Sequence, residues 1–129
     1  MKFISKILIA IAASILISGC SNLKSRSSNG LVGYTETGKA SFYGMKHQNK
    51  KTASGDVFNQ NLKTAAHRKL PFDTKVKVTN VENGKSVVAR INDRGPYIKG
   101  RIIDLSKSAF SSIANPASGV IRVKLEVVD

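Results

Sequence analysis

The sequence predicts a mainly β domain, a small barrel or sandwich of about six short strands with one helix. Residues 74–81 alternate between apolar and polar side chains, which is typical of a half-buried strand. The Asn83-Gly84 pair that follows is the strongest short-range signal for a β-hairpin and favours a type I′ turn. Residues 120–128 alternate again, with an apolar side chain at every second position from Ile121 to Val127.

The other expected elements are shorter. Further strands are expected at residues 40–43, 86–91 and 101–104, with a strand or turn at 62–67. Residues 45–56 are rich in Lys, Gln, Asn and small side chains and predict a long loop. Residues 106–114 predict a helix, capped by Asp104 or Ser106 and ended by Asn115-Pro116.

Residues 1–19 predict a signal peptide, because Lys2 and Lys6 precede an apolar run that is too short for a confident membrane span. The run ends in Ile17-Ser18-Gly19-Cys20, which resembles a bacterial lipobox. Cleavage before Cys20 makes this residue the lipidated N-terminus of the mature protein; the alternative is an ordinary secretory peptide with a stray cysteine. We expect residues 20–33 to be a flexible tether and residues 34–129 to be the folded domain.

The net charge narrows the class of partner. The chain carries a formal charge of +13, and loss of Lys2 and Lys6 with the signal peptide leaves +11. In the cytosol such a charge indicates nucleic-acid binding, but export argues against it. The anionic partners outside the inner membrane are lipid headgroups, lipopolysaccharide and the carboxylates of peptidoglycan. The single cysteine excludes an intramolecular disulfide.

The most informative stretch is Arg90-Ile91-Asn92-Asp93-Arg94-Gly95-Pro96-Tyr97, in which a strand ends at Gly-Pro and presents the carboxylate of Asp93. A strand fixes the backbone of such an acid while the following loop exposes its side chain to substrate. The alternative is that Asn and Asp before Gly-Pro are ordinary turn residues.

This stretch, together with Ile103-Asp104-Leu105-Ser106, closely resembles the core motif of the rare lipoprotein A family of septal-ring lytic transglycosylases. The resemblance covers nearly all of residues 38–128, in order. Its other segments are residues 38–44, 52–56, 64–67, 70–72, 78–80 and 83–84. The resemblance implies a six-stranded double-psi β-barrel with one or two short helices.

The resemblance also implies the site. It assigns Asp93 as the acid that becomes a base, and it adds Asp56 and His67 as catalytic positions, with His67 bonded to Asp93 or to substrate. The family usually has glutamate where this chain has Asp56. From the residues alone, Asp56 is equally well a solvated loop acid. For a histidine such as His67, a structural role is the commoner case on sequence alone. We expect substrate contacts from Tyr43, Thr52, Ser54, Arg94 and Tyr97.

An acid at position 93 must hold a proton near neutral pH, and the adjacent Arg94 opposes this. We therefore expect Asp93 to lie near Asp56 in a cleft and Arg94 to bond elsewhere, with Asp104 as a candidate partner. Phe72 either stacks on a sugar ring or packs against the barrel.

The function that the resemblance implies is cleavage of the β-1,4 MurNAc–GlcNAc bond in peptide-stripped peptidoglycan, leaving a 1,6-anhydro-MurNAc end. The alternative is a non-catalytic, expansin-like glycan-binding lipoprotein. We expect no cofactor and no metal, because the chain has two histidines and one cysteine. We expect a monomer, lipid-anchored in a Gram-negative cell envelope. Ser21, in place of an aspartate that would signal inner-membrane retention, indicates the outer membrane facing the periplasm.

Overall fold

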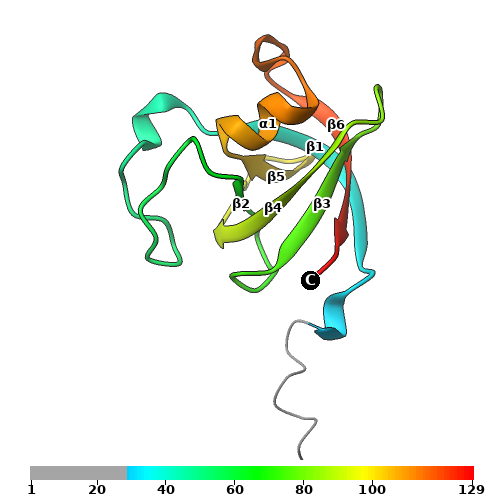
Figure 1. Ribbon diagram of the computed structural model, residues 1–129, viewed down its shortest axis with the longest axis horizontal. Helices are drawn as coiled ribbons and strands as arrows, with labels where there is room; N and C mark the ends of the chain where they lie inside the picture. Colours follow the sequence, from blue (N-terminus) through cyan, green and yellow to red (C-terminus); the bar gives the residue numbers. More distant parts are fainter. Residues whose placement is uncertain (1–28) are drawn as a thin grey trace, which may run out of the picture.

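The computed structural model of the protein describes residues 29–129 (Figure 1). The predicted signal peptide, the predicted lipidation site Cys20 and the start of the predicted tether lie outside the described residues. Within the described range, no helix combines the length and the apolar character needed to span a membrane.

Six strands close into a barrel, which confirms the predicted fold class. The strands are β1 (Thr35–Phe42), β2 (Thr64–Ala66), β3 (Lys75–Asn80), β4 (Ser86–Asp93), β5 (Arg101–Leu105) and β6 (Ile121–Val127). The helix α1 (Lys107–Ile113) joins β5 to β6 through the short 3-10 helix η4 (Pro116–Ser118). Two more 3-10 helices, η2 (Asn29–Leu31) and η3 (Met45–His47), flank β1.

The strand order around the barrel is β1-β5-β2-β4-β3-β6. Two neighbouring pairs, β1 with β5 and β2 with β4, run parallel, and the other pairs are antiparallel. Exchanging β1-β2-β3 with β4-β5-β6 leaves this order unchanged, so the two halves of the domain are related by a pseudo-twofold. Each parallel pair also carries one register shift.

The alternating segments form the core as predicted. In β6 the apolar positions from Ile121 to Val127 are buried, and Arg122 and Lys124 between them are exposed. Helix α1 packs over one end of the barrel (Figure 1) and contributes the fully buried Phe110. Its N-cap is Ser106, whose hydroxyl accepts a hydrogen bond from the Ala109 N–H. Of the two predicted caps, Ser106 is therefore the correct one.

The hairpin between β3 and β4 forms where predicted, but its turn is not type I′. That turn needs positive φ at both central residues, and of this pair only Gly84 has it, at φ 78°. The Asn83 side chain is engaged at both ends: Oδ1 accepts from the Lys85 N–H, and Nδ2 donates to the Ile113 carbonyl. Asn83 makes these two side-chain bonds with a backbone φ outside the positive, left-handed range.

Two N-terminal boundaries differ from expectation. Strand β1 begins at Thr35, five residues before the predicted strand, because its first half pairs with β6 along the barrel wall. The described end of the predicted tether is folded: Leu31 packs against the core and the Gly33 N–H donates to the Val127 carbonyl at 2.9 Å.

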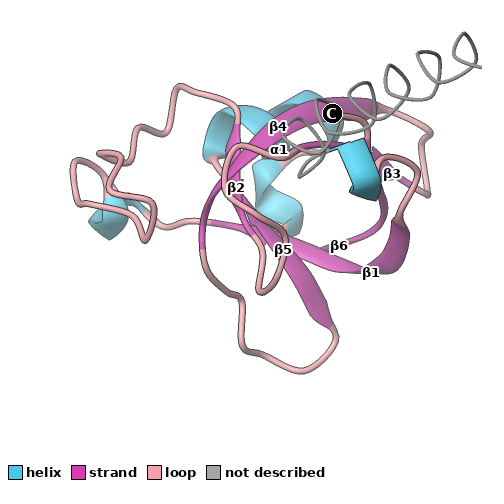
Figure 2. Cartoon of the chain, turned by 90° about the horizontal axis from the view of Figure 1, so that it is seen from below, coloured by secondary structure: helices cyan, strands magenta, loops and turns pink. Residues whose placement is uncertain are grey.

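The fold gathers three segments at one place. The last residue of β4 is Asp93, and Tyr43 directly follows β1. The long segment between β1 and β2 projects from the side of the barrel (Figures 1 and 2) and returns to it through backbone bonds near the end of β4.

Candidate active site

Asp93 is half-buried at the end of β4, and its carboxylate accepts three hydrogen bonds. Oδ1 accepts from the backbone N–H groups of Ala53, at 2.8 Å, and Arg94, at 2.9 Å. Oδ2 accepts from the Tyr43 hydroxyl at 2.7 Å. The two carboxylate oxygens therefore differ in their hydrogen bonding: among the described residues, Oδ1 has two donors and Oδ2 has one.

Tyr43 is held in place through both its ring and its backbone carbonyl. Its ring packs against Phe58, with centroids 4.5 Å apart, and its carbonyl accepts from the buried Gln60 amide at 3.0 Å. Burial raises the pKa of the Tyr43 hydroxyl strongly, and the hydrogen bond to Asp93 raises it further. The hydroxyl therefore keeps its proton and acts as a donor to Asp93.

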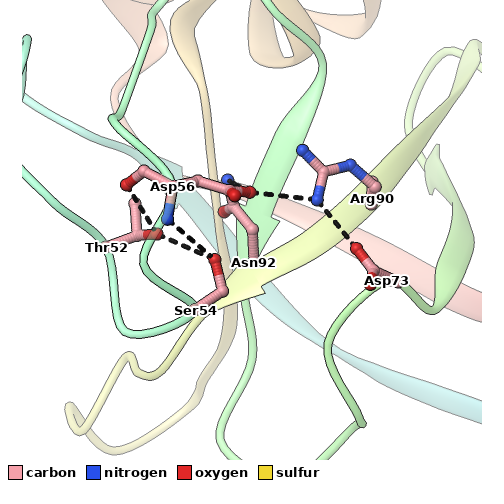
Figure 3. Close-up of polar contacts among 6 residues, drawn as sticks. All are labelled: Thr52, Ser54, Asp56, Asp73, Arg90 and Asn92. Atoms are coloured by element: carbon pink, nitrogen blue, oxygen red, sulfur yellow. Dashed lines mark hydrogen bonds and ion pairs between the residues drawn. The ribbon is translucent and has the colours of Figure 1, made fainter.

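The Ala53 donor is placed by a tight turn over Thr52–Asp56 (Figure 3). The Thr52 N–H donates to the Asp56 carbonyl at 2.8 Å, and the Thr52 and Ser54 hydroxyls lie 3.0 Å apart. The Ser54 N–H donates to the Asn92 carbonyl at 3.2 Å, which fastens the turn to β4. Thr52 and Ser54, predicted to bind substrate, thus shape the loop beside the acid.

The Asp56 carboxylate points to Arg90 (Figure 3), which lies 3.1 Å away and also bonds Asp73 at 2.9 Å. The Asn92 side chain donates to the same Asp56 oxygen at 3.4 Å. The hydrogen bond from Arg90 lowers the pKa of Asp56, so this carboxyl group is ionised at neutral pH. The structure therefore brings Asp56 to the site through its turn, and its carboxylate is not among the partners of Asp93.

Arg94 turns away from the Asp93 carboxylate, as predicted, but its partner is not Asp104. Its Nη1 donates to the carbonyls of Leu70, at 2.9 Å, and His67, at 3.2 Å. Its guanidinium lies 4.0 Å from the centre of the Phe72 ring. Asp104 accepts instead from the Ser41 hydroxyl of the neighbouring strand β1.

The His67 imidazole does not make the expected bond to the Asp93 carboxylate. Its Nε2 lies 2.9 Å from Glu36 Oε1, and its Nδ1 accepts from the N–H groups of Lys69, at 3.0 Å, and Leu70, at 3.1 Å. The link to Asp93 runs through the backbone, where the His67 N–H donates to the Asp93 carbonyl at 3.1 Å.

Sequence reasoning missed the backbone donor of Ala53, the Glu36 partner of His67 and the support from Gln60. A backbone donor has no side-chain signal, and Glu36 lies 31 residues from His67. Tyr97, expected to contact substrate, is 75% exposed beyond the end of β4. Within residues 29–129 no three His, Cys, Asp or Glu side chains gather as a metal site would require.

Comparison with known proteins places this chain in a family. The family model described as lytic transglycolase matches residues 35–125. The chain is 49% identical over 105 residues to the endolytic peptidoglycan transglycosylase RlpA of Pasteurella multocida, covering 81% of this chain and 36% of that protein. It is 53% identical over 97 residues to the protein of the same name from Campylobacter jejuni, covering 75% and 35%. The chain thus spans about a third of the length of these curated relatives.

Solved structures agree on the fold. A Streptomyces papain inhibitor superposes with a TM-score of 0.63 at 22% identity, covering 76% of this chain and 97% of that one. The apo expansin of Clavibacter michiganensis superposes with a TM-score of 0.60 at 20% identity, covering 74% and 50%. With the strand order, the family match and these identities, the chain belongs to the RlpA family of double-psi β-barrel proteins.

Proposed function

We propose that this protein is a lytic transglycosylase that cleaves the β-1,4 bond between MurNAc and GlcNAc in peptidoglycan strands, with peptide-stripped strands preferred. The observation that carries the proposal is the carboxylate of Asp93, which is presented at a strand end, fixed by three donors and not bonded by the Arg94 guanidinium. The names of the curated relatives support the same activity.

A transglycosylase needs one carboxyl group, because the 6-hydroxyl of MurNAc supplies the nucleophile and no water is activated. In the first step the acid gives its proton to the glycosidic oxygen, and the bond from that oxygen to C1 breaks. The carboxylate then takes the proton of the 6-hydroxyl as that oxygen bonds to C1. The products are a free 4-hydroxyl and a 1,6-anhydro-MurNAc end, and the carboxyl group regains its proton.

The donors on Asp93 assign its two oxygens. Oδ1 is filled by the N–H groups of Ala53 and Arg94, so the catalytic proton belongs on Oδ2. The Tyr43 hydroxyl accompanies that oxygen and stabilises the charge left after proton transfer. A glycan strand lying over the carboxyl group removes water from it, which favours the neutral acid before the reaction.

The test is digestion of peptide-stripped peptidoglycan, with mass spectrometry of the released fragments. We expect 1,6-anhydro products from the wild type and none above background from Asp93→Asn, because general acid–base groups contribute about 10²–10⁴-fold. The amide retains the shape and the acceptor for the Ala53 and Arg94 N–H groups. Asp129→Asn makes the same change at an exposed carboxylate and serves as the matched control.

Three results contradict the proposal. An Asp93→Asn variant as active as wild type removes the assignment of the acid. Reducing ends without anhydro rings indicate a hydrolase. Binding to the sacculus without any released fragment supports the expansin-like, non-catalytic alternative.

We also propose that a lipid on Cys20 holds the protein at the outer membrane, facing the periplasm. The support is the lipobox-like Ile17-Ser18-Gly19-Cys20 and the following Ser21. Labelled palmitate should enter the wild type and not Cys20→Ser, and the label should fractionate with the outer membrane. Label in the variant, or none in the wild type, contradicts the anchor.

A further inference from the structure

We infer that His67 is a positioning residue, whose imidazole holds the turn of residues 67–70 against the backbone of Asp93 and transfers no proton. This inference rests on the proposed function, since it concerns how the acid is held. A histidine beside a catalytic acid often acts as a general acid or base, and we infer that His67 does not.

Every polar atom of the imidazole is already used. The side chain is buried, with 6% of its surface exposed. Nδ1 accepts from the N–H groups of Lys69 and Leu70, so the ring proton lies on Nε2, which donates to Glu36. A proton on Nδ1 would face two N–H groups and would break the turn. The imidazole has no nitrogen left for a substrate.

The imidazole also faces a different space from the acid. Together with Glu36 and Tyr34 it lines a cavity of about 290 Å³, beside Leu70 and Pro71. Asp93 is not among the residues that line this cavity. The imidazole therefore borders a cavity that the Asp93 carboxylate does not line.

The turn that the imidazole closes is fastened to the end of β4 at two points. The His67 N–H donates to the Asp93 carbonyl at 3.1 Å. The Arg94 guanidinium donates to the carbonyls of His67 and Leu70, the first and last residues of the turn. Loss of the turn therefore frees both residues 93 and 94, one of which is the acid and the other a backbone donor to it.

The contacts of Nδ1 identify the decisive variant. A side-chain acceptor that takes the N–H groups two and three residues ahead is the pattern that Asn forms readily. In His67→Asn the amide oxygen replaces Nδ1 and keeps the turn, although the link to Glu36 is lost. His67→Ala loses both. Neither variant can transfer a proton. If His67 transfers a proton, both variants should lose activity; if it only holds the turn, His67→Asn should keep it.

The test combines hydrogen exchange with activity. We expect the amides of His67, Lys69 and Leu70 to be protected in the wild type and in His67→Asn, and unprotected in His67→Ala. Release of anhydro fragments should stay within about fivefold of wild type in the Asn variant, because Asn is as good a cap. It should fall by about 100-fold in the Ala variant, the scale of a misplaced catalytic group. The pH dependence of kcat/KM should keep its shape in the Asn variant.

Asn83→Ala is the matched control for stability, because it removes a comparable side-chain cap at the far end of β4. It should lower the melting temperature without lowering activity. A His67→Asn variant with protected amides and activity as low as that of the Ala variant overturns the inference. So does an imidazole whose 15N shifts place the ring proton on Nδ1 in the wild type, a measurement that needs no variant to fold.

The activity assay tests the proposed function, whereas hydrogen exchange and the 15N shifts test the role of His67. A wild type that forms no anhydro fragment refutes the transglycosylase activity. The hydrogen-exchange and 15N measurements then decide the inference, since both report the turn and its connection to Asp93 without any substrate.

Discussion

The hydrogen bond from Tyr43 to Asp93 can be tested by removing one oxygen atom. Tyr43→Phe deletes the hydroxyl that lies 2.7 Å from Oδ2 and keeps the ring that packs against Phe58. A hydrogen bond to a charged group contributes about 1.5–3 kcal/mol. We expect the low end, about 1.5 kcal/mol, because Asp93 is half-exposed and retains two other donors. For a domain of about 100 residues this lowers the melting temperature by roughly 6–12 °C.

The same residue predicts a dependence on alkaline pH. Burial and the bond to Asp93 raise the pKa of Tyr43 in the folded state well above its ordinary value of about 10. Below pH 10 both states keep the proton, so the contribution is fully present. Above pH 10 the unfolded chain loses the proton while the folded chain keeps it, so stability falls by about 1.4 kcal/mol per pH unit.

The assay is urea unfolding of the wild type and Tyr43→Phe between pH 8 and about pH 11. The difference between the two curves isolates Tyr43 from the many lysines that titrate in the same range. Tyr34→Phe removes an exposed hydroxyl and should change stability by less than about 0.5 kcal/mol. A Tyr43→Phe variant as stable as wild type, with the same slope above pH 10, refutes the reasoning.

Two further predictions concern stability. The hydrogen bond from Arg90 lowers the pKa of Asp56, so its contribution is present above about pH 3.9 and is lost as the pH falls through the lower folded value. Asp56→Asn should therefore be less stable than wild type at pH 7, and urea unfolding should show the difference shrinking at pH 3; a constant difference contradicts this. In Gly38→Ala the new Cβ would lie 2.6 Å from the Ile102 Cγ2, so we expect a loss of about 1–3 kcal/mol in thermal unfolding. Gly30→Ala meets nothing within 4 Å, and an equal loss there would contradict the clash.

The sequence predicts the parts of the fold that rest on periodicity and local capping. Short-range patterns predict the buried side chains of β6, the strand β3 and the Ser106 cap of α1. Strand β1 was predicted too short because only its last residues contribute buried apolar side chains. Its first half, from Thr35 to Lys39, is held by pairing to β6, and such pairing leaves no alternating apolar signal.

The site was predictable in its residues and less so in its contacts. The placement of Asp93 at a strand end follows from the Gly-Pro that stops the strand. The partner of His67 does not follow from the sequence, because Glu36 lies in a part of β1 without a local signal, and β5 separates β1 from β2 in the barrel. The direction of Arg94 also depends on a tertiary feature, the free carbonyls of the turn that ends at Leu70.

The family resemblance implies a glutamate at position 56, and the contacts of Asp56 show how the shorter side chain fits. Asp56 does not reach the acid with its carboxylate; it belongs to the turn whose Ala53 N–H donates to Asp93. Arg90 extends from β4 to meet the Asp56 carboxylate and is itself braced by Asp73, so a side chain one methylene shorter still closes the contact. The Ser54 N–H bonds the same turn to Asn92, the residue beside Asp93, and so fixes the loop to the strand. A substitution at position 56 is therefore expected to act on Asp93 through the position of one backbone donor, the Ala53 N–H.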